Sequence, residues 1–442
     1  MRHGGTACSS RWTRVARRGG APATLAAVTA AAGLLVAACS SGSPTASGGA
    51  ASAPAGQASP AATPTSQLTI TPGNGQRHVN PAKGVTVTAH GSKLSRVTVT
   101  AGHATMRGTV NQAGTTWRSA WALQPARHYT IHATAVDPAG KTITTASSFS
   151  TLTPAATDTA MIFEGYKQSY GVGIPIRLTF SSPVTNKAAV ERSLQVRTST
   201  PVTGAWYWDG DQTLYFRPMN YWKPGTTVSF SGHLAGLEAS RGVYFTANLT
   251  QTFRIGPSLI VVASTKTHYL NVYYQGKLWG HWPISTGRPG LDTVDGTYIT
   301  LEKGNPVRMV GNGYNELVND AVRFTYSGDY LHSAPWSVGE QGVVNVSHGC
   351  VNLSPEHAAM YYARAVPGDP VTVIGSPHQG QWDDGFTVWF KTWKALLKGS
   401  ALGMAVQAGP SGSTFVSPSS VTGTPETSRL HGAKPQNYLP QS

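Results

Sequence analysis

Apolar and polar residues alternate in short runs along most of the chain. Residues 85–88, 97–100 and 129–136 each place an apolar side chain at every second position, and a turn-forming stretch follows at 137–141. Side chains of a strand point alternately to its two faces, so a period of two predicts half-buried strands. We therefore predict that residues 67–153 form a small β-sandwich, an Ig-like domain.

The same pattern returns over residues 154–256, where we predict a second β-sandwich with an alternating run at 174–180. This stretch resembles a bacterial Ig-like domain. This stretch also contains Trp206, Trp208 and Trp222, which could form a surface patch that stacks on sugars. Large aromatic side chains more often fill the core or an interface of such a domain. We therefore predict buried positions for all three.

Residues 257–377 predict a third, β-rich domain. The continuous apolar run at 259–262 is typical of a buried strand, and the stretch 275–277 is typical of a hairpin turn. Residues 309–329 combine glycines with two tyrosines, a composition that predicts a lid over a pocket.

The chain ends in two stretches of different composition. Residues 378–403 are rich in tryptophan, and Trp389, Trp393 and Leu396 recur at helical spacing, so we predict a short helix that packs on the preceding domains. Residues 404–442 are rich in Ser, Pro, Gly and Thr and are predicted to be disordered. The predicted fold class is therefore mainly β, with a short Trp-rich helical segment near the C-terminus.

The first 66 residues predict an export signal and a tether. Residues 1–20 are basic, residues 21–38 are small and apolar, and Cys39 follows directly. That order is typical of a signal peptide, which we assign to residues 1–38, and the apolar run is short for a membrane span. Residues 39–66 carry no charge and consist largely of Ser, Ala, Gly, Pro and Thr, so they predict a flexible spacer.

The net charge is +15, and no acidic residue precedes Asp137. Residues 67–152 hold eight Lys or Arg against that one acid. Basic surfaces attract polyanions, but the sequence has no recognition helix, RNA-binding motif or Lys/Arg run, so nucleic acid is not a predicted partner. The anionic membrane face and cell-wall polymers fit better. Two interpretations of the basic first domain stay open, a wall- or membrane-facing spacer and an ordinary solvated surface.

Cysteine usage points to one thiol. Cys8 lies within the predicted signal peptide and Cys39 ends it, which leaves Cys350 without a disulfide partner. A lone thiol is either a buried, inert side chain or a nucleophile. The residues around Cys350 favour the second interpretation.

A catalytic thiol needs a base that takes its proton and a third group that orients the base. His332 could be the base, and the backbone carbonyl or the hydroxyl of Ser333 could orient it. The amides of Gly349 and Cys350 could donate to a developing oxyanion.

The segment SHGCVN at 347–352, with HSAP at 332–335 upstream, resembles the signature of the L,D-transpeptidases, bacterial enzymes with a YkuD-type catalytic domain that cross-link peptidoglycan. The resemblance covers about residues 154–400. It implies that an Ig-like domain precedes the catalytic domain and that the Trp-rich segment braces the two. The residues VAAC, ending at Cys39, resemble a bacterial lipobox. That resemblance implies a diacylated Cys39 and an extracytoplasmic protein, lipid-anchored to the cell membrane and facing the cell wall.

By this resemblance the Cys350 thiolate attacks the carbonyl of an L-configured residue in a peptidoglycan stem peptide. His332 takes the thiol proton, giving an ion pair, and Ser333 holds the imidazole. The backbone N–H groups of His348, Gly349 and Cys350 stabilise the oxyanion. The terminal D-Ala leaves and an acceptor amine resolves the acyl-enzyme to a 3→3 cross-link. Carbapenem-type β-lactams should also trap such a thiolate.

The resemblance also implies substrate contacts. Tyr326, rather than Tyr314, is expected near the nucleophile, where its hydroxyl could assist the oxyanion. Asn352 braces the loop or contacts the stem peptide, and Met309 and Trp336 are assigned to substrate binding.

No cofactor and no metal site are predicted. His332, His348, Cys350 and His357 lack the spacing of a zinc set, and a metal-bound thiolate would be a poor nucleophile here. Two alternatives to the transpeptidase stay open. One is an L,D-carboxypeptidase that trims terminal D-Ala, and the other is a non-catalytic wall-binding lipoprotein.

Overall fold

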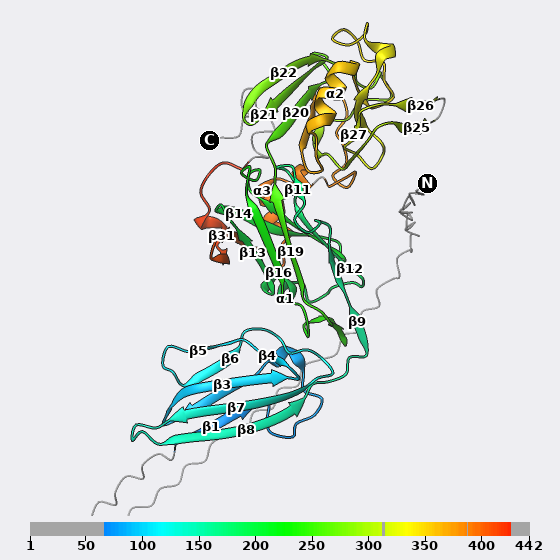
Figure 1. Ribbon diagram of the computed structural model, residues 1–442. Coiled ribbons are helices and arrows are strands. Elements are labelled where there is room, and N and C mark those ends of the chain that lie inside the picture. The colour runs from blue at the N-terminus through cyan, green and yellow to red at the C-terminus, as the bar shows by residue number, and fades with distance from the viewer. Residues whose placement is uncertain (1–65, 312–313, 387, 426–442) are drawn as a thin grey trace, which may run out of the picture. The chain divides into compact units, whose positions relative to one another are not determined.

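The computed structural model describes residues 66–311, 314–386 and 388–425. The predicted signal peptide, Cys39 and nearly all of the predicted tether lie outside the described residues, as do residues 426–442. The described chain consists mainly of strands (Figure 1), which confirms the predicted fold class. In this described part, no helix is long and apolar enough to cross a membrane.

Residues 67–153, all of which are described, form a sandwich of two sheets with strand orders β1-β2-β6-β5 and β4-β3-β7-β8. The alternating pattern buries Val87, Ile131 and Phe149 in one core, each at most 1% exposed. The elements are β1 (Gln67–Thr71), the 3-10 helix η1 (Pro81–Lys83), β2 (Thr86–His90), β3 (Lys93–Ala101), β4 (Ala104–Thr105), β5 (Gly108–Val110), β6 (Thr116–Ser119), β7 (His128–Val136) and β8 (Thr142–Ser150).

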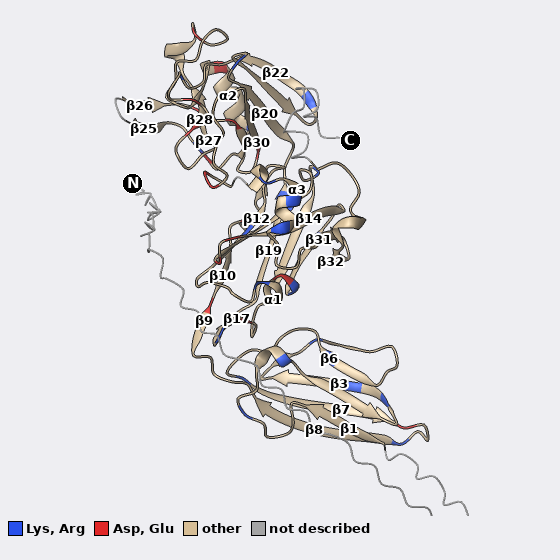
Figure 2. Ribbon diagram, turned by 180° about the vertical axis from the view of Figure 1, so that it is seen from behind, with Lys and Arg blue, Asp and Glu red and all other residues tan. Residues whose placement is uncertain are grey.

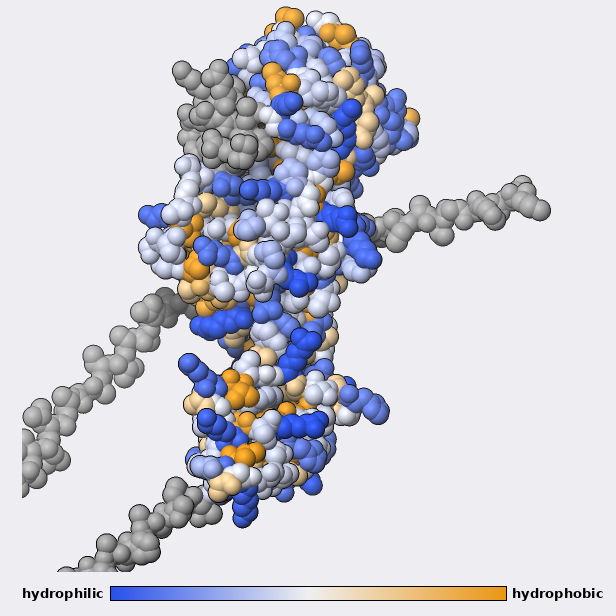
Figure 3. All heavy atoms as spheres, turned by 60° about the vertical axis from the view of Figure 1, so that its left-hand side comes forward, coloured by the Kyte–Doolittle hydropathy of each residue, from blue (hydrophilic) through white to orange (hydrophobic). Residues whose placement is uncertain are grey.

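The surface of this first domain is basic. Lys and Arg are spread over its strands and loops (Figure 2), and the one acidic residue between positions 67 and 153, Asp137, lies between β7 and β8. In Figure 3, hydrophilic side chains project around small groups of hydrophobic residues on this domain. The face in view is therefore polar and mixed rather than one continuous apolar patch.

The second Ig-like domain is built on sheets with strand orders β10-β12-β15-β14-β31-β32 and β11-β19-β16-β13, beside a small sheet β17-β18-β9. Trp206, Trp208 and Trp222 are 1%, 7% and 2% exposed, so the predicted buried positions are confirmed. The elements are β9 (Ala156–Asp158), β10 (Ala160–Ile162), β11 (Ser169–Tyr170), β12 (Ile176–Phe180), α1 (Lys187–Arg192), β13 (Leu194–Thr198), β14 (Val202–Asp209), β15 (Thr213–Pro218), β16 (Thr227–Gly232), β17 (Glu238–Ser240), β18 (Val243–Phe245) and β19 (Leu249–Ile255).

The prediction of a disordered tail from residue 404 is wrong for the part that the structure describes. Strand β31 (Ala405–Gly409) pairs antiparallel with β14, and β32 (Gly412–Val416) pairs with β31. A short 3-10 helix, η4 (Pro418–Ser420), follows. A sheet edge presents unpaired backbone groups, and β14 offers such an edge to residues whose composition alone does not predict a strand.

The third domain combines sheets with strand orders β22-β21-β20-β30-β23 and β24-β27-β28-β29 with the hairpin β25-β26. The apolar run in β20 is buried on both faces: Val261 faces the core of this domain, whereas Ile260 and Val262 join the core of the second domain. The elements are β20 (Leu259–Ser264), β21 (Tyr269–Tyr274), β22 (Lys277–Pro283), β23 (Gly296–Ile299), β24 (Glu302–Gly304), β25 (Val307–Gly311), β26 (Tyr314–Val318), β27 (Ala321–Arg323), β28 (Tyr330–Ser333), the 3-10 helix η2 (Pro335–Ser337), β29 (Val351–Leu353), α2 (Pro355–Arg364) and β30 (Pro370–Ile374).

The Trp-rich segment forms a shorter helix than predicted. Trp389 lies in the 3-10 turn η3 (Val388–Phe390), and helix α3 (Trp393–Lys398) begins only after Thr392, whose side chain accepts a hydrogen bond from the Ala395 N–H. An extended N-cap residue ends the preceding turn. Trp389 is buried and its indole N–H donates to the Gly173 carbonyl at 2.6 Å, which ties the segment to the second domain.

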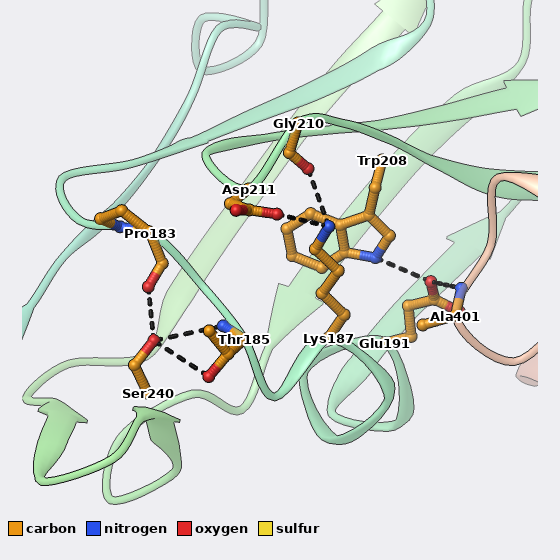
Figure 4. Close-up of polar contacts among 9 residues, drawn as sticks. All are labelled: Pro183, Thr185, Lys187, Glu191, Trp208, Gly210, Asp211, Ser240 and Ala401. Atoms are coloured by element: carbon orange, nitrogen blue, oxygen red, sulfur yellow. Dashed lines mark hydrogen bonds and ion pairs between the residues drawn. The ribbon is translucent and has the colours of Figure 1, made fainter. Parts of the chain in front are cut away.

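A buried carboxylate fastens the end of α3 to the same domain. Glu191 of α1 is fully buried and accepts from the Trp208 indole N–H at 2.8 Å and from the Ala401 N–H at 2.7 Å (Figure 4). The Ser400 hydroxyl donates to its other oxygen at 2.7 Å. A buried charge is tolerated when several donors satisfy it. The C-terminal segment is thus held by specific polar contacts as well as by packing.

Candidate active site

Parallel pairing of β28 with β29 brings the two halves of the predicted site together. In this register His332 lies opposite Asn352, two residues beyond Cys350. Cys350 comes directly before β29, at the end of a turn that begins at Ser347. The intervening chain, which contains η2, makes the crossover that a parallel pair requires.

His332 and Cys350 line the same pocket, which has a volume of about 370 Å³. The pocket lies between the β25-β26 hairpin and the Ser347–Cys350 turn. Its lining residues are Met309, Tyr314, Glu316, Val318, His332, Trp336, Val346, Ser347, His348, Cys350 and Asn352.

The imidazole of His332 is oriented by the backbone of the next residue. Nδ1 lies 2.9 Å from the Ser333 carbonyl oxygen, which can only accept, so Nδ1 carries the proton. Of the two groups of Ser333 that could orient the ring, the carbonyl makes the contact. Burial lowers the pKa of His332, and the bond to the Ser333 carbonyl opposes this effect. The neutral ring therefore holds Nε2 unprotonated, as a general base requires.

The Cys350 thiol rests in its neutral form. The pKa of Cys350 is raised to about 12: burial is the main cause, the Asp329 carboxylate adds to the rise, and a hydrogen bond from the Tyr330 backbone opposes it. The Sγ–H points to the Gly328 carbonyl at 3.9 Å. Among the residues that the structure describes, no hydrogen bond joins the sulfur to the His332 ring. The described side chains thus show no contact between the sulfur and the imidazole, and the ion pair implied by the resemblance stays a prediction.

The turn before Cys350 is fixed by side-chain contacts. The Ser347 hydroxyl accepts from the Gly349 N–H at 3.1 Å and donates to the Cys350 carbonyl at 2.6 Å. The Thr293 hydroxyl donates to the Gly349 carbonyl at 2.5 Å. Of the predicted oxyanion donors, the Gly349 N–H is thus engaged. The N–H groups of His348 and Cys350 make no hydrogen bond within the described chain and stay available.

Gly349 is required by both conformation and space. Its φ of +131° lies in a region that L side chains rarely adopt, and a Cβ there would meet Asp329 Oδ1 at 2.5 Å. Asp329 comes three residues before His332. The pKa of Asp329 is raised to about 6, chiefly by burial; the hydrogen bond from the Thr325 hydroxyl opposes the rise, the Asp384 charge adds to it, and Arg323 opposes it.

Three of the predicted substrate-binding residues line the pocket: Met309, Trp336 and Asn352. Asn352 is 3% exposed and its side-chain amide donates to the Ser337 hydroxyl at 3.0 Å, so it also braces the loop. Trp336 is 56% exposed at the rim.

The structure places Tyr314, rather than Tyr326, among the residues that line the pocket. Tyr326 does not line the pocket; its ring packs edge-on against Phe386, with centroids 6.1 Å apart, and Arg177 lies near its hydroxyl. Tyr314 lines the pocket instead and lies 4.8 Å from the His348 ring. The cause is that the predicted lid is a β-hairpin, which turns the side chain of Tyr314 inward.

Comparison with known proteins identifies the family. A model described as the L,D-transpeptidase catalytic domain matches residues 258–373, and a bacterial Ig domain model matches residues 76–238. L,D-transpeptidase 2 of Mycobacterium tuberculosis is 32% identical over 332 residues, which cover 72% of this chain and 80% of that protein. The chain belongs to the L,D-transpeptidase family.

Other L,D-transpeptidases match a smaller part of the chain. L,D-transpeptidase 1 of Mycobacterium tuberculosis is 39% identical over 215 residues, which cover 46% of this chain and 80% of that protein. A solved LD transpeptidase in complex with imipenem is 36% identical, covers 50% of this chain and 100% of its own, and has a TM-score of 0.43. The predicted family and Ig-like architecture are confirmed, and the protein is an enzyme with transpeptidase activity.

The sequence alone does not indicate several residues that lie around this pocket. Thr293, Asp329 and Asp384 give no signal as motifs, since they lie on separate loops outside the cysteine signature. The only sequence signal for any of the three is that Asp329 lies three residues before His332, which suggests that it is close to the predicted base. No group of three His, Cys, Asp or Glu side chains suited to a metal occurs among the described residues.

Proposed function

We propose that this protein is a lipid-anchored peptidoglycan L,D-transpeptidase that acts outside the cytoplasmic membrane through a cysteine acyl-enzyme. The observation that supports the chemistry best is the pocket into which both Cys350 and His332 open, with His332 Nε2 unprotonated. A nucleophile and a base that share one pocket can act on one carbonyl. Family membership supplies the reaction class.

The raised pKa of Cys350 favours proton transfer during attack rather than a standing thiolate. The thiol leaves the Gly328 carbonyl and turns toward His332. Nε2 takes the proton as the sulfur bonds to the carbonyl carbon of the L-centre of diaminopimelate in the donor stem. The free N–H groups of His348 and Cys350 donate to the oxyanion that forms.

The tetrahedral intermediate then collapses. The C–N bond to the terminal D-Ala breaks, the imidazolium gives its proton to the departing amine, and a thioester remains on Cys350. The side-chain amine of diaminopimelate in an acceptor stem attacks the thioester and loses a proton to His332. A new amide, the 3→3 cross-link, forms as the sulfur leaves and regains its proton.

Location follows from the substrate and from the N-terminal sequence. Peptidoglycan lies outside the cytoplasmic membrane, and the order of a basic stretch, an apolar stretch and Cys39 favours export and lipidation. One acyl signal alone gives weak anchoring, whereas the diacylated cysteine of a lipoprotein provides two chains. The uncharged stretch that follows would let the folded domains reach into the wall.

The decisive experiment incubates the full-length protein in detergent with disaccharide-tetrapeptide and analyses the products by mass spectrometry. Wild type should give a cross-linked dimer with loss of one D-Ala, and Cys350→Ala should give none. Tripeptide without dimer would mean a carboxypeptidase. Identical behaviour of wild type and Cys350→Ala would refute the enzymatic proposal and leave a wall-binding lipoprotein.

Inhibition provides a second test of the same thiol. The strained amide of a carbapenem should acylate Cys350, because thiol attack opens the ring and leaves no separate leaving group to diffuse away. Intact-mass analysis should show one added carbapenem on wild type and none on Cys350→Ala or His332→Ala. Adduct on Cys350→Ala would place the reactive group elsewhere.

A further inference from the structure

The turn formed by residues 325–329 lies directly against the nucleophile. The Gly328 carbonyl accepts the Cys350 thiol at 3.9 Å, and the Asp329 carboxylate lies where a side chain on Gly349 would be. The electrostatic effect of Asp329 on the pKa of Cys350 reports the same proximity. The position of this turn therefore decides where the sulfur rests.

The turn is organised from within by one buried hydroxyl. Thr325 is fully buried, and its Oγ1 accepts from the Asp329 N–H at 2.7 Å and the Gly328 N–H at 3.2 Å. The same hydroxyl lies 3.2 Å from Asp329 Oδ2, to which it donates. These contacts hold residues 325–329 together as a compact turn. A displacement of one of these residues therefore displaces the others.

Asp384 holds this unit from outside. Its carboxylate accepts two hydrogen bonds from Ser327, from the N–H at 2.7 Å and from the hydroxyl at 2.6 Å. The two residues are 57 positions apart. Hydrogen bonds to a carboxylate are shorter and stronger than neutral ones, and two of them fix an orientation as well as a distance.

The segment that carries Asp384 is itself anchored on the second Ig-like domain. Phe386 is 5% exposed, packs edge-on against Phe163 with centroids 4.5 Å apart, and lies under the Arg177 guanidinium at 4.9 Å. The bond from Trp389 to Gly173 holds the same segment three residues later. Asp384 thus connects the second domain to the turn beside Cys350.

We infer that Asp384 is a positioning residue for Cys350, through which the second Ig-like domain and the C-terminal segment set the geometry of the nucleophile. Asp384 contacts neither the pocket nor the thiol; it acts through Ser327 and the turn. The inference rests on the proposed role of Cys350 as the attacking sulfur. It gives the C-terminal segment a function in acylation beyond joining two domains.

The test compares Asp384→Ala with Asp383→Ala in the full-length protein. Asp383 is the adjacent, exposed carboxylate, so it controls for charge and for position in the chain. Carbapenem acylation of Asp384→Ala should slow by about tenfold, since small misplacements of a reacting group cost one to two orders of magnitude. Asp383→Ala should react at the wild-type rate. Equal rates for both variants would overturn the inference.

A readout independent of catalysis separates this inference from the proposed function. Iodoacetamide labelling of Cys350, followed across pH by peptide mass mapping, reports how well solvated the thiol is. A released turn admits water, so the labelling midpoint should fall by about one pH unit in Asp384→Ala while acylation slows. An unchanged midpoint contradicts the positioning role whether or not the wild type cross-links stem peptides.

Ser327→Ala and the double variant test the connection itself. If Asp384 acts through Ser327, the effects on acylation should not add, because both changes break one contact. Ser327→Ala keeps the backbone N–H bond, so it should be the milder variant and serves if Asp384→Ala fails to fold. Wild-type acylation and labelling in Ser327→Ala, or additive effects in the double variant, would refute the route through Ser327.

Discussion

At the scale of residues, the site is a neutral thiol beside a neutral imidazole. His332 is held by the Ser333 carbonyl with Nε2 free, and Cys350 points away to the Gly328 carbonyl. Burial raises the pKa of the Cys350 thiol, so little thiolate is present before a substrate binds. In the proposed mechanism, the sulfur attacks a substrate carbonyl while the thiol proton is transferred to His332.

Gly349→Ala should abolish acylation and lower the free energy of unfolding by about 1–3 kcal/mol, since the strained φ and the clash with Asp329 combine. Gly276→Ala is the matched control, with a φ of +77° and nothing within 4 Å of its added Cβ. Thermal unfolding and carbapenem acylation measure the two effects. Similar loss of acylation in both variants would show that the clash with Asp329 is irrelevant.

Asp329→Asn should change how stability depends on pH. The folded pKa of about 6 exceeds the ordinary value, so the folded state binds more protons than the unfolded chain between about pH 4 and 6. Stability therefore falls as pH rises through this window. The melting temperature of wild type should drop more between these limits than that of Asp329→Asn, and the exposed Asp383→Asn should behave as wild type. Equal pH dependence in all three would contradict the raised pKa.

At the scale of elements, strands β31 and β32 complete a sheet whose other strands lie between Ala160 and Pro218. The Val196 N–H donates to the Ser413 hydroxyl at 3.0 Å across 217 positions. Ala405, Val406 and Ala408 are at most 4% exposed. The C-terminal strands are thus part of the core of the second domain, and Glu191 fixes the residues just before them.

Truncation after Gly403 should destabilise the protein strongly, because it uncovers the β14 edge and the apolar side chains behind β31. Truncation after residue 425 removes no described element and is the control. Thermal unfolding of the full-length protein and both truncations measures the difference. A melting temperature after the first truncation equal to that after the second would show that β31 contributes little.

At the scale of the whole molecule, the first domain carries an excess of basic charge. The first domain carries eight basic residues and one acid, with Lys93 and Arg96 both exposed on β3. Screening weakens attraction between exposed charges. The affinity of this domain for a polyanion in the wall should therefore fall as the salt concentration rises.

Lys93→Glu with Arg96→Glu should weaken sedimentation of the full-length protein with purified anionic sacculi at low salt. The control is Lys394→Glu, which reverses the charge of an exposed lysine on α3, outside the first domain. The difference should vanish at about 0.5 M salt, where charges are screened within a few ångströms. Equal binding of all variants at low salt would favour the ordinary solvated surface.

The sequence by itself determined the succession of β-rich domains and the family, and it predicted Cys350 as the thiol and His332 as the base. These depend on strand periodicity and on residue types within two short segments, so local pattern is sufficient. The prediction of Cys350 and His332 as catalytic residues awaits the experiments above, although the structure brings both into one pocket.

Only the tertiary structure decided which tyrosine lines the pocket, that burial raises the pKa of the thiol, and that Ala405–Gly409 and Gly412–Val416 form strands. It also revealed Asp329 and Asp384. Each depends on chain segments that meet across tens to hundreds of positions, and on the burial and hydrogen bonds created there. The local sequence pattern carries no information about these long-range contacts, because the packing of the domains determines which segments lie together.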